Sequence, residues 1–249
     1  MKKKQSVIDA LLILVLLAAI APAYADDNGQ PKIHGKTYGE WSAEWWQWAY
    51  AGPNGKNAVQ DTTGASCAVN QPTGKVWFLA GSFALPGVER TCTIPPNRAL
   101  FYPLVNTLWT DCPALPGECP DSGSDECLTD AEVRGILTVF AEGGDRACQL
   151  RSTLDGASIS SLQILTVRTQ SPKFTSKLPE NNFVSGCALP LPPGKTGRQI
   201  AEGYWVMLPP LSPGEHTLTL HGAACDSQTG DVLFENGVTY HLTVLGGQQ

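Results

Sequence analysis

The sequence predicts a mainly β protein. We expect a single-domain antiparallel β-sandwich, jelly-roll or immunoglobulin-like, with an N-terminal tryptophan-rich helix and one amphipathic helix near 129–142. Short apolar runs separated by Pro and Gly turns predict the sandwich. Two segments with helical periodicity behind a capping box predict the helices. Eight cysteines behind an apolar leader indicate a disulfide-linked exported domain.

The leader has the three parts of a secretory signal peptide. Lys2, Lys3 and Lys4 form a positive region, and residues 7–20 are apolar apart from Asp9. The stretch 23–25 (AYA) matches the A-x-A cleavage pattern. We therefore expect a signal peptide over 1–25, a single domain over 26–249, and a secreted or periplasmic location. No other apolar run approaches the ~18 residues of a membrane span, so none is expected after cleavage.

The charge balance argues against some partners. Without the leader's three lysines and one aspartate, the 17 basic and 23 acidic residues become 14 and 22, a net charge of −8. Nucleic acids and anionic membranes attract basic surfaces, so neither is an expected partner.

The first predicted helix is the stretch TYGEWSAEWWQWAYA, residues 37–51. It holds four of the seven tryptophans within eight residues. Thr37 is a good N-cap, Glu40 three residues later completes a capping box, and Gly52-Pro53 ends the helix.

The aromatic residues of this helix divide into two faces. At 100° per residue Trp41, Trp45 and Trp48 share one stripe, which we expect to dock on the sheet. Trp46 and Tyr50 point the other way and must find a second interior surface or face water. In the second case they could form an aromatic platform for a sugar or another flat ligand.

Two glutamates on the same helix bear on that hypothesis. Glu40 and Glu44, spaced i and i+4, could accept hydrogen bonds from ligand hydroxyls. As a catalytic pair they would be poorly placed, because glycosidases need carboxylates on opposite sides of the scissile bond. A simpler interpretation is that acidic residues near a helix N-terminus stabilise the helix dipole.

The rest of the chain is predicted to be strands, apart from a second helix. Thr129 and Glu132 form its capping box, and Val133, Ile136, Leu137 and Phe140 form its apolar stripe. We expect Asp155-Gly156 to join the strands at 148–154 and 162–169, and Asn236-Gly237 predicts a two-residue type I′ hairpin. The expected strands are 76–83, 90–94, 99–105, 148–154, 162–169, 203–208, 215–221, 232–235 and 238–245, with a short one near 182–188.

The cysteines predict disulfides rather than metal ligation. Their number is even, no C-x-x-C occurs, and the pairing stays open. Three of them lie in a loop rich in Pro, Gly and Asp, where we expect a local bridge. The eight are Cys67, Cys92, Cys112, Cys119, Cys127, Cys148, Cys187 and Cys225.

Two clusters are candidate metal sites, although no cofactor is otherwise expected. Asp121, Asp125 and Glu126 could hold calcium, but their spacing does not match an EF-hand, and a solvated acidic loop is the simpler interpretation. His221 and His241 are predicted on the solvent face of one sheet; a metal site there would need a third ligand.

No G-x-S-x-G, H-E-x-x-H, P-loop or G-x-G-x-x-G motif is present. A catalytic group on a β scaffold needs no local motif, so an enzyme stays possible as a second hypothesis. It would be a hydrolase or lyase acting on a polymer, with Glu40, Glu44 or Asp111 as acid and His221 or His241 as base.

Several strings carry a resemblance: YGEWSAEWWQW, VWFLAGSF, ALFYPLVN, and GYWVMLPPLSPGEHTLTLHG ahead of VTYHLTV. Over most of the mature chain they resemble a group of exported bacterial proteins of no known activity. The resemblance implies export and brings no catalytic residues.

The leading functional hypothesis is a binding or structural module for an extracellular ligand, with carbohydrate first. Its candidate site residues are Trp46, Tyr50, Glu40 and Glu44. The alternatives are the polymer-acting enzyme and a subunit of a cell-surface assembly, in which the aromatic patch meets a partner protein. The oligomeric state cannot be predicted from these patterns.

Overall fold

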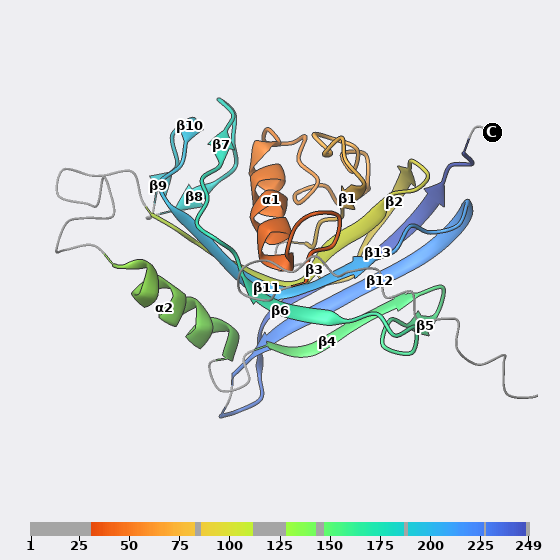
Figure 1. Cartoon of the computed structure of the whole chain (residues 1–249). Helices are drawn as coiled ribbons and strands as arrows, with labels where there is room; N and C mark the ends of the chain where they lie inside the picture. Colours follow the sequence, from red (N-terminus) through yellow and green to blue (C-terminus); the bar gives the residue numbers. More distant parts are fainter. Residues whose placement is uncertain are drawn as a thin grey trace, which may run out of the picture. The chain divides into compact units, whose positions relative to one another are not determined.

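The computed structural model describes residues 31–82, 86–111, 128–142, 147–186, 189–226 and 228–247 (Figure 1). The described residues 31–37 and the residues from Tyr38 onward belong to two separate units. In the N-terminal unit, Ile33 and Lys36 exchange backbone hydrogen bonds, and His34 and Gly35 between them both have positive φ. The predicted signal peptide lies outside the described residues.

The larger unit contains two main sheets. The first has the order β1-β3-β11-β6 and is formed by β1 (Val76–Phe78), β3 (Ala99–Thr110), β11 (Gln199–Leu208) and β6 (Thr166–Gln170). The second has the order β2-β13-β12-β4-β5 and is formed by β2 (Val88–Ile94), β13 (Val232–Val244), β12 (Gly214–Cys225), β4 (Ala147–Leu154) and β5 (Ala157–Ser158). Two small pairs complete the described strands: β7 (Lys177–Leu178) with β10 (Gly194–Lys195), and β8 (Ser185–Gly186) with β9 (Leu189–Pro190).

The two sheets pack face to face around one hydrophobic core. Alternate residues point into it, as the burial pattern of β2 shows, because successive side chains of a strand lie on opposite faces. The first sheet contributes Tyr102, Leu104, Val206 and Leu208, and the second contributes Leu218, Leu220, Tyr240 and Leu242. The predicted mainly β sandwich is confirmed.

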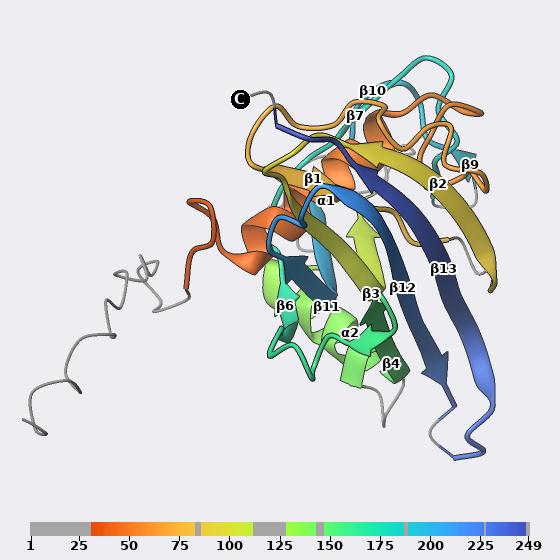
Figure 2. The ribbon, with the colours of Figure 1, turned by 90° about the vertical axis from the view of Figure 1, so that its right-hand side faces the viewer.

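Two strand pairs depart from the antiparallel arrangement that the sequence predicted. β1 pairs with β3 in parallel, and β2 pairs with β13 in parallel. Between β1 and β3 the chain crosses to the second sheet to form β2, so β1 and β3 are not joined by a hairpin. Figure 2 shows β13 between β2 and β12.

The predicted type I′ hairpin at Asn236-Gly237 is also wrong. β13 runs unbroken through this dipeptide, and Asn236 pairs with Gly222 of β12. The connection between β12 and β13 is instead the segment 226–231, where Asp226 Oδ1 accepts hydrogen bonds from the backbone N–H groups of Gln228 and Thr229. Asp155-Gly156 does form a turn after β4, with positive φ at both residues, but it leads to the short β5 rather than to the strand expected at 162–169.

The tryptophan-rich helix is α1 (Tyr38–Ala51), and its predicted docking stripe is confirmed. Trp41, Trp45 and Trp48 are each at most 7% exposed. The Trp45 ring lies 5.5 Å from that of Trp205 on β11, and the Trp48 ring lies 5.6 Å from that of Phe78 on β1. Figure 1 shows α1 on the face of the first sheet that points away from the second sheet.

The second helix, α2 (Asp130–Glu142), begins where the capping box predicts. The Glu132 carboxylate accepts from the Thr129 N–H at 2.7 Å, and the Glu132 N–H donates to the Thr129 hydroxyl at 3.3 Å. Val133 and Leu137 pack against Ile200 of β11. Of the predicted stripe, the side chain of Phe140 lies outside the described residues.

Two disulfides lie within the part of the chain that the structure describes. Cys67–Cys92 joins the loop before β1 to β2, and Cys148–Cys225 joins β4 to β12. The other four predicted disulfide residues, Cys112, Cys119, Cys127 and Cys187, lie outside the described residues. Neither of the helices described here is long and apolar enough to cross a membrane.

Candidate functional site

A cavity of about 240 Å³ lies between the C-terminal half of α1, β3, β13 and the segment that follows β1. Five aromatic residues line it: Trp45, Trp46, Tyr50, Phe183 and Phe234. Four polar residues line it as well: Ser82, Asn106, Thr107 and Asn236. We call it the aromatic–amide cavity. No charged side chain is among the described residues that line it.

Four of the rings form a chain of contacts, which begins with the Trp45 and Trp46 rings edge to face at 5.2 Å. The Trp46 and Tyr50 rings meet edge to face, with centroids 5.4 Å apart, and Tyr50 meets Phe183 in the same way at 6.2 Å. This geometry is the one that aromatic pairs prefer. Burial raises the pKa of the Tyr50 phenol to about 12, so the phenol is neutral at physiological pH.

Asn236 is held rigidly in the wall of the cavity and is 3% exposed. Its Oδ1 accepts from the Ser82 N–H at 2.5 Å and from the Ser82 hydroxyl at 3.1 Å, and its Nδ2 donates to the Leu104 carbonyl at 3.0 Å. A Cβ atom on Gly81 would lie 2.6 Å from Asn236 Nδ2, so the chain needs glycine there. Asn236 therefore fixes this wall rather than offering free hydrogen-bonding groups.

A buried arginine supports the same wall from behind. Arg90 is 2% exposed and donates to the carbonyls of Ala80 and Gly81 and to the Tyr240 hydroxyl at 2.7, 3.1 and 2.7 Å, respectively. The Tyr240 hydroxyl in turn donates to the Ala80 carbonyl at 2.7 Å. The backbone at residues 80–81 is thus held by two side chains from different strands.

Two residues of the cavity carry buried donors without a partner. Trp46 Nε1 and Asn106 Nδ2 are shielded from solvent and make no hydrogen bond in the structure. A buried donor left unsatisfied costs about 1–3 kcal/mol, so such atoms need an explanation. Trp77 and Trp205 also have an unpartnered Nε1, but neither lines this cavity.

The expectation that Trp46 and Tyr50 form an open platform is wrong. Trp46 is 7% exposed and Tyr50 is partly buried, so the two rings do not form an open platform together. The second interior surface exists, because Phe183 packs on Tyr50 from a segment far along the chain. Glu40 and Glu44 are partly exposed on α1, and neither lines the cavity.

The residues of the enzyme hypothesis do not meet. Asp111 forms an ion pair with Arg198 at 2.9 Å and accepts from Trp109 Nε1 at 2.8 Å. His221 pairs with Gly237 and His241 with Thr217, so the two histidines lie four residues apart along β12 and β13, about 13 Å. His221 lies 2.8 Å from a carboxylate oxygen of Glu235, but neither residue lines a described cavity.

The expected calcium ligands Asp121, Asp125 and Glu126 lie outside the described residues. Within the described ranges, no group of three or more His, Cys, Asp or Glu side chains is placed to hold a metal ion.

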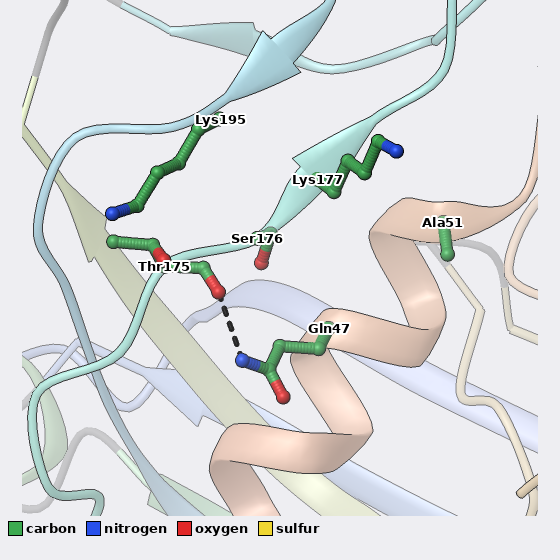
Figure 3. Close-up of a pocket in the computed structure, with 6 residues that line it drawn as sticks. All are labelled: Gln47, Ala51, Thr175, Ser176, Lys177 and Lys195. Carbon is green, nitrogen blue, oxygen red and sulfur yellow. Dashed lines mark hydrogen bonds between the residues drawn. The ribbon is translucent and has the colours of Figure 1, made fainter.

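A second, wider hollow of about 530 Å³ lies on another side of α1 and is lined by Gln47, Ala51, Thr175, Ser176, Lys177 and Lys195 (Figure 3). Gln47 Nε2 donates to the Thr175 carbonyl at 2.8 Å, and Ser176 donates to Gln199 at 2.6 Å. The two lysine side chains point in different directions (Figure 3). This hollow lacks a converging set of unpaired groups.

The fold and these sites define a disulfide-linked β-sandwich protein with a tryptophan-rich helix and one aromatic–amide cavity. Comparison of the chain with protein-family models, with curated proteins and with solved structures gives no match.

Sequence reasoning found Trp46 and Tyr50 but missed Asn106, Asn236 and Phe183. Asn106 interrupts a largely apolar strand, which was the one available signal. Phe183 lies in a loop without periodicity, and the Asn236-Gly237 dipeptide indicated a turn instead.

Proposed function

We propose that this protein is an exported binding module that takes a small, neutral, hydroxyl-bearing ligand in the aromatic–amide cavity, with carbohydrate the leading class. One observation carries the proposal: five aromatic and four polar side chains line one cavity, with no charged side chain among the described lining residues. Binding cavities typically combine apolar and aromatic walls with a few polar groups that fix the ligand's orientation.

The chemistry of the walls favours a neutral ligand. A charged ligand would lose its hydration in a cavity whose described lining offers no opposite charge, and that loss is costly. A sugar presents C–H groups to aromatic rings and hydroxyl groups to amide and hydroxyl side chains, and the cavity is lined by both kinds of residue.

Export is supported by two independent features. The predicted signal peptide is followed by a domain that contains the disulfides Cys67–Cys92 and Cys148–Cys225. Disulfides persist in oxidising compartments such as the periplasm and the cell exterior.

A glycan-binding screen of the full mature chain tests this function. We expect at least one neutral glycan to bind the wild type, and Tyr50→Ala to weaken that binding about tenfold by removing one aromatic wall. The matched control is Gln47→Ala, on the same helix but in the wider hollow, which should bind like the wild type. Melting curves verify that each variant is folded. Equal binding by the wild type and Tyr50→Ala would refute this site.

A further inference from the structure

Beyond the proposed function, we infer that the wider hollow beside α1 binds a polyuronate, an acidic polysaccharide with carboxylate groups, through Lys177 and Lys195. We call this hollow the lysine hollow (Figure 3). No residue belongs to the described lining of both the lysine hollow and the aromatic–amide cavity. The inference therefore does not depend on the neutral ligand of that cavity.

The two lysines lie directly opposite each other. Lys177 of β7 pairs with Lys195 of β10 in an antiparallel pair. Residues opposite each other in such a pair place their side chains on one face, with Cβ atoms about 4.5–5.5 Å apart, and like charges at this position destabilise the pair. An anionic ligand that meets both side chains would offset this repulsion.

No acidic residue compensates these lysines within the part of the chain that the structure describes. Both are exposed, no acidic side chain is among the described residues that line the hollow, and neither lysine side chain has an ion pair or hydrogen bond with a described residue. Lys173, a little earlier in the same segment, differs, because its ammonium lies 2.9 Å from a carboxylate oxygen of Asp130. The lysine hollow is thus a cationic surface on a chain in which acidic residues outnumber basic ones.

The directions of the two lysines favour a polymer over a small ion. Their ammonium groups point in different directions, so one small anion would not meet both as they lie (Figure 3). A polymer with anionic groups on successive units can meet each in turn. The hollow of about 530 Å³ is within the roughly 300–1,000 Å³ of ligand sites. Gln47 and Thr175 add an amide and a hydroxyl group to its lining, groups that pair with sugar hydroxyls.

The spacing of charges favours a polyuronate over nucleic acid. Double-stranded DNA carries one negative charge per about 1.7 Å of its axis, and a protein with an excess of acidic residues repels so dense a charge. A polyuronate carries one carboxylate on each sugar unit, so its charges are farther apart. Two lysines can then neutralise much of the short segment that the hollow holds.

The test compares an oligomer of galacturonic acid with its methyl ester, which has the same backbone without the charges. Calorimetric titration of the full mature chain measures both at about 10 mM and about 100 mM salt, where the Debye length is about 30 Å and about 10 Å. We expect the acid to bind at the lower salt at least about tenfold more tightly than the ester. Its affinity should fall at the higher salt, because exposed charges are screened.

The chain offers a matched control for the lysine variants. Lys177→Gln and Lys195→Gln should each weaken binding of the acid about threefold, and the double variant about tenfold, as expected for exposed charge pairs. Lys75→Gln makes the same change in net charge at another exposed lysine, outside the lysine hollow, and should leave the affinity unchanged. Melting curves verify that each variant is folded.

Three outcomes would overturn this inference. They are no binding of the acid at low salt, equal binding of the acid and the ester, and an equal loss in Lys75→Gln and Lys177→Gln, which would show only an effect of net charge. Tyr50→Ala should bind the acid like the wild type, and the lysine variants should bind a neutral glycan from the screen like the wild type. The inference and the proposed function can therefore each fail alone.

Discussion

Single side chains fix the geometry of the aromatic–amide cavity. Arg90 and Asn236 are both almost fully buried, and each satisfies backbone groups that would otherwise be orphaned in the wall. Buried polar networks are costly when incomplete and stabilising when every member is paired. The backbone of residues 80–82 in this wall is therefore held by paired polar groups.

Another residue pair makes stability depend on pH. His216 Nδ1 lies 2.8 Å from the Asp155 carboxylate, and its Nε2 lies 2.9 Å from the Ser212 carbonyl. The hydrogen bond to Asp155 raises the pKa of His216 above its usual 6.5. The same hydrogen bond lowers the pKa of Asp155 below its usual 3.8.

The directions of the two pKa shifts define the pH range in which this pair stabilises the fold. Because the pKa of His216 is raised, its contribution to the free energy of unfolding is full below pH 6.5 and is lost as pH rises through the native pKa. Because the pKa of Asp155 is lowered, its contribution to the free energy of unfolding is present above pH 3.8 and is lost as pH falls through the native pKa.

We expect a double-mutant cycle of His216→Gln and Asp155→Asn, followed by urea unfolding, to show coupling at about pH 5 and none at about pH 9. Unchanged coupling at the higher pH would contradict a charged histidine.

At the scale of elements, α1 packs on the first sheet with one face and lines the cavity with the other. Its stripe of Trp41, Trp45 and Trp48 is anchored on the sheet, while Trp46 and Tyr50 line the cavity. Periodicity predicted both faces, because indole rings spaced i, i+4 and i+7 point the same way. It could not predict the burial of Trp46, because the segments that cover it come from elsewhere in the chain.

Trp45→Ala tests this anchoring. Trp45 is 2% exposed, contacts Trp205 and donates its indole N–H to the Leu79 carbonyl at 2.9 Å. Its removal should lower the free energy of unfolding by about 3–5 kcal/mol, as large cavities in cores do. Gln47→Ala, on the partly exposed side of the same helix, should cost less than about 1 kcal/mol. Urea denaturation measures both, and similar losses would contradict the docking role of the stripe.

At β13, the local sequence pattern predicted the wrong structure. Asn-Gly is the strongest short signal for a tight hairpin, yet Asn236 lies within β13 because its side chain closes three hydrogen bonds in the interior. The turn formed instead where Asp226 could accept backbone N–H groups. A buried side-chain requirement thus overrode a local backbone preference.

At the scale of the whole molecule, two disulfides among the described residues join distant parts of the sandwich. Cys148–Cys225 spans 77 residues and Cys67–Cys92 spans 25. On the chain-entropy account, losing the longer link costs about 4.5 kcal/mol and losing the shorter about 3.5 kcal/mol. We expect the paired Cys→Ala variants to rank in this order in urea unfolding of the oxidised protein. The reverse order would show that native-state effects outweigh loop length.

The sandwich class and both helices were predictable, because each rests on local periodicity or capping. The parallel pairs β1–β3 and β2–β13 were not, because strand partners far apart in sequence leave no local signal. The cavity was predictable only in part, for the same reason. The helical pattern of α1 predicted its aromatic residues, whereas Asn106, Phe183 and Asn236 are brought to the cavity by the tertiary fold.

The position of β13 has a consequence for how the protein is made. β13 follows every other strand that the structure describes, yet it separates β2 from β12, and β2 pairs with no other described strand. During synthesis, β2 therefore has no described strand to pair with until β13 has been made. The second sheet closes only at that late step, so its assembly depends on contacts between strands far apart in the sequence.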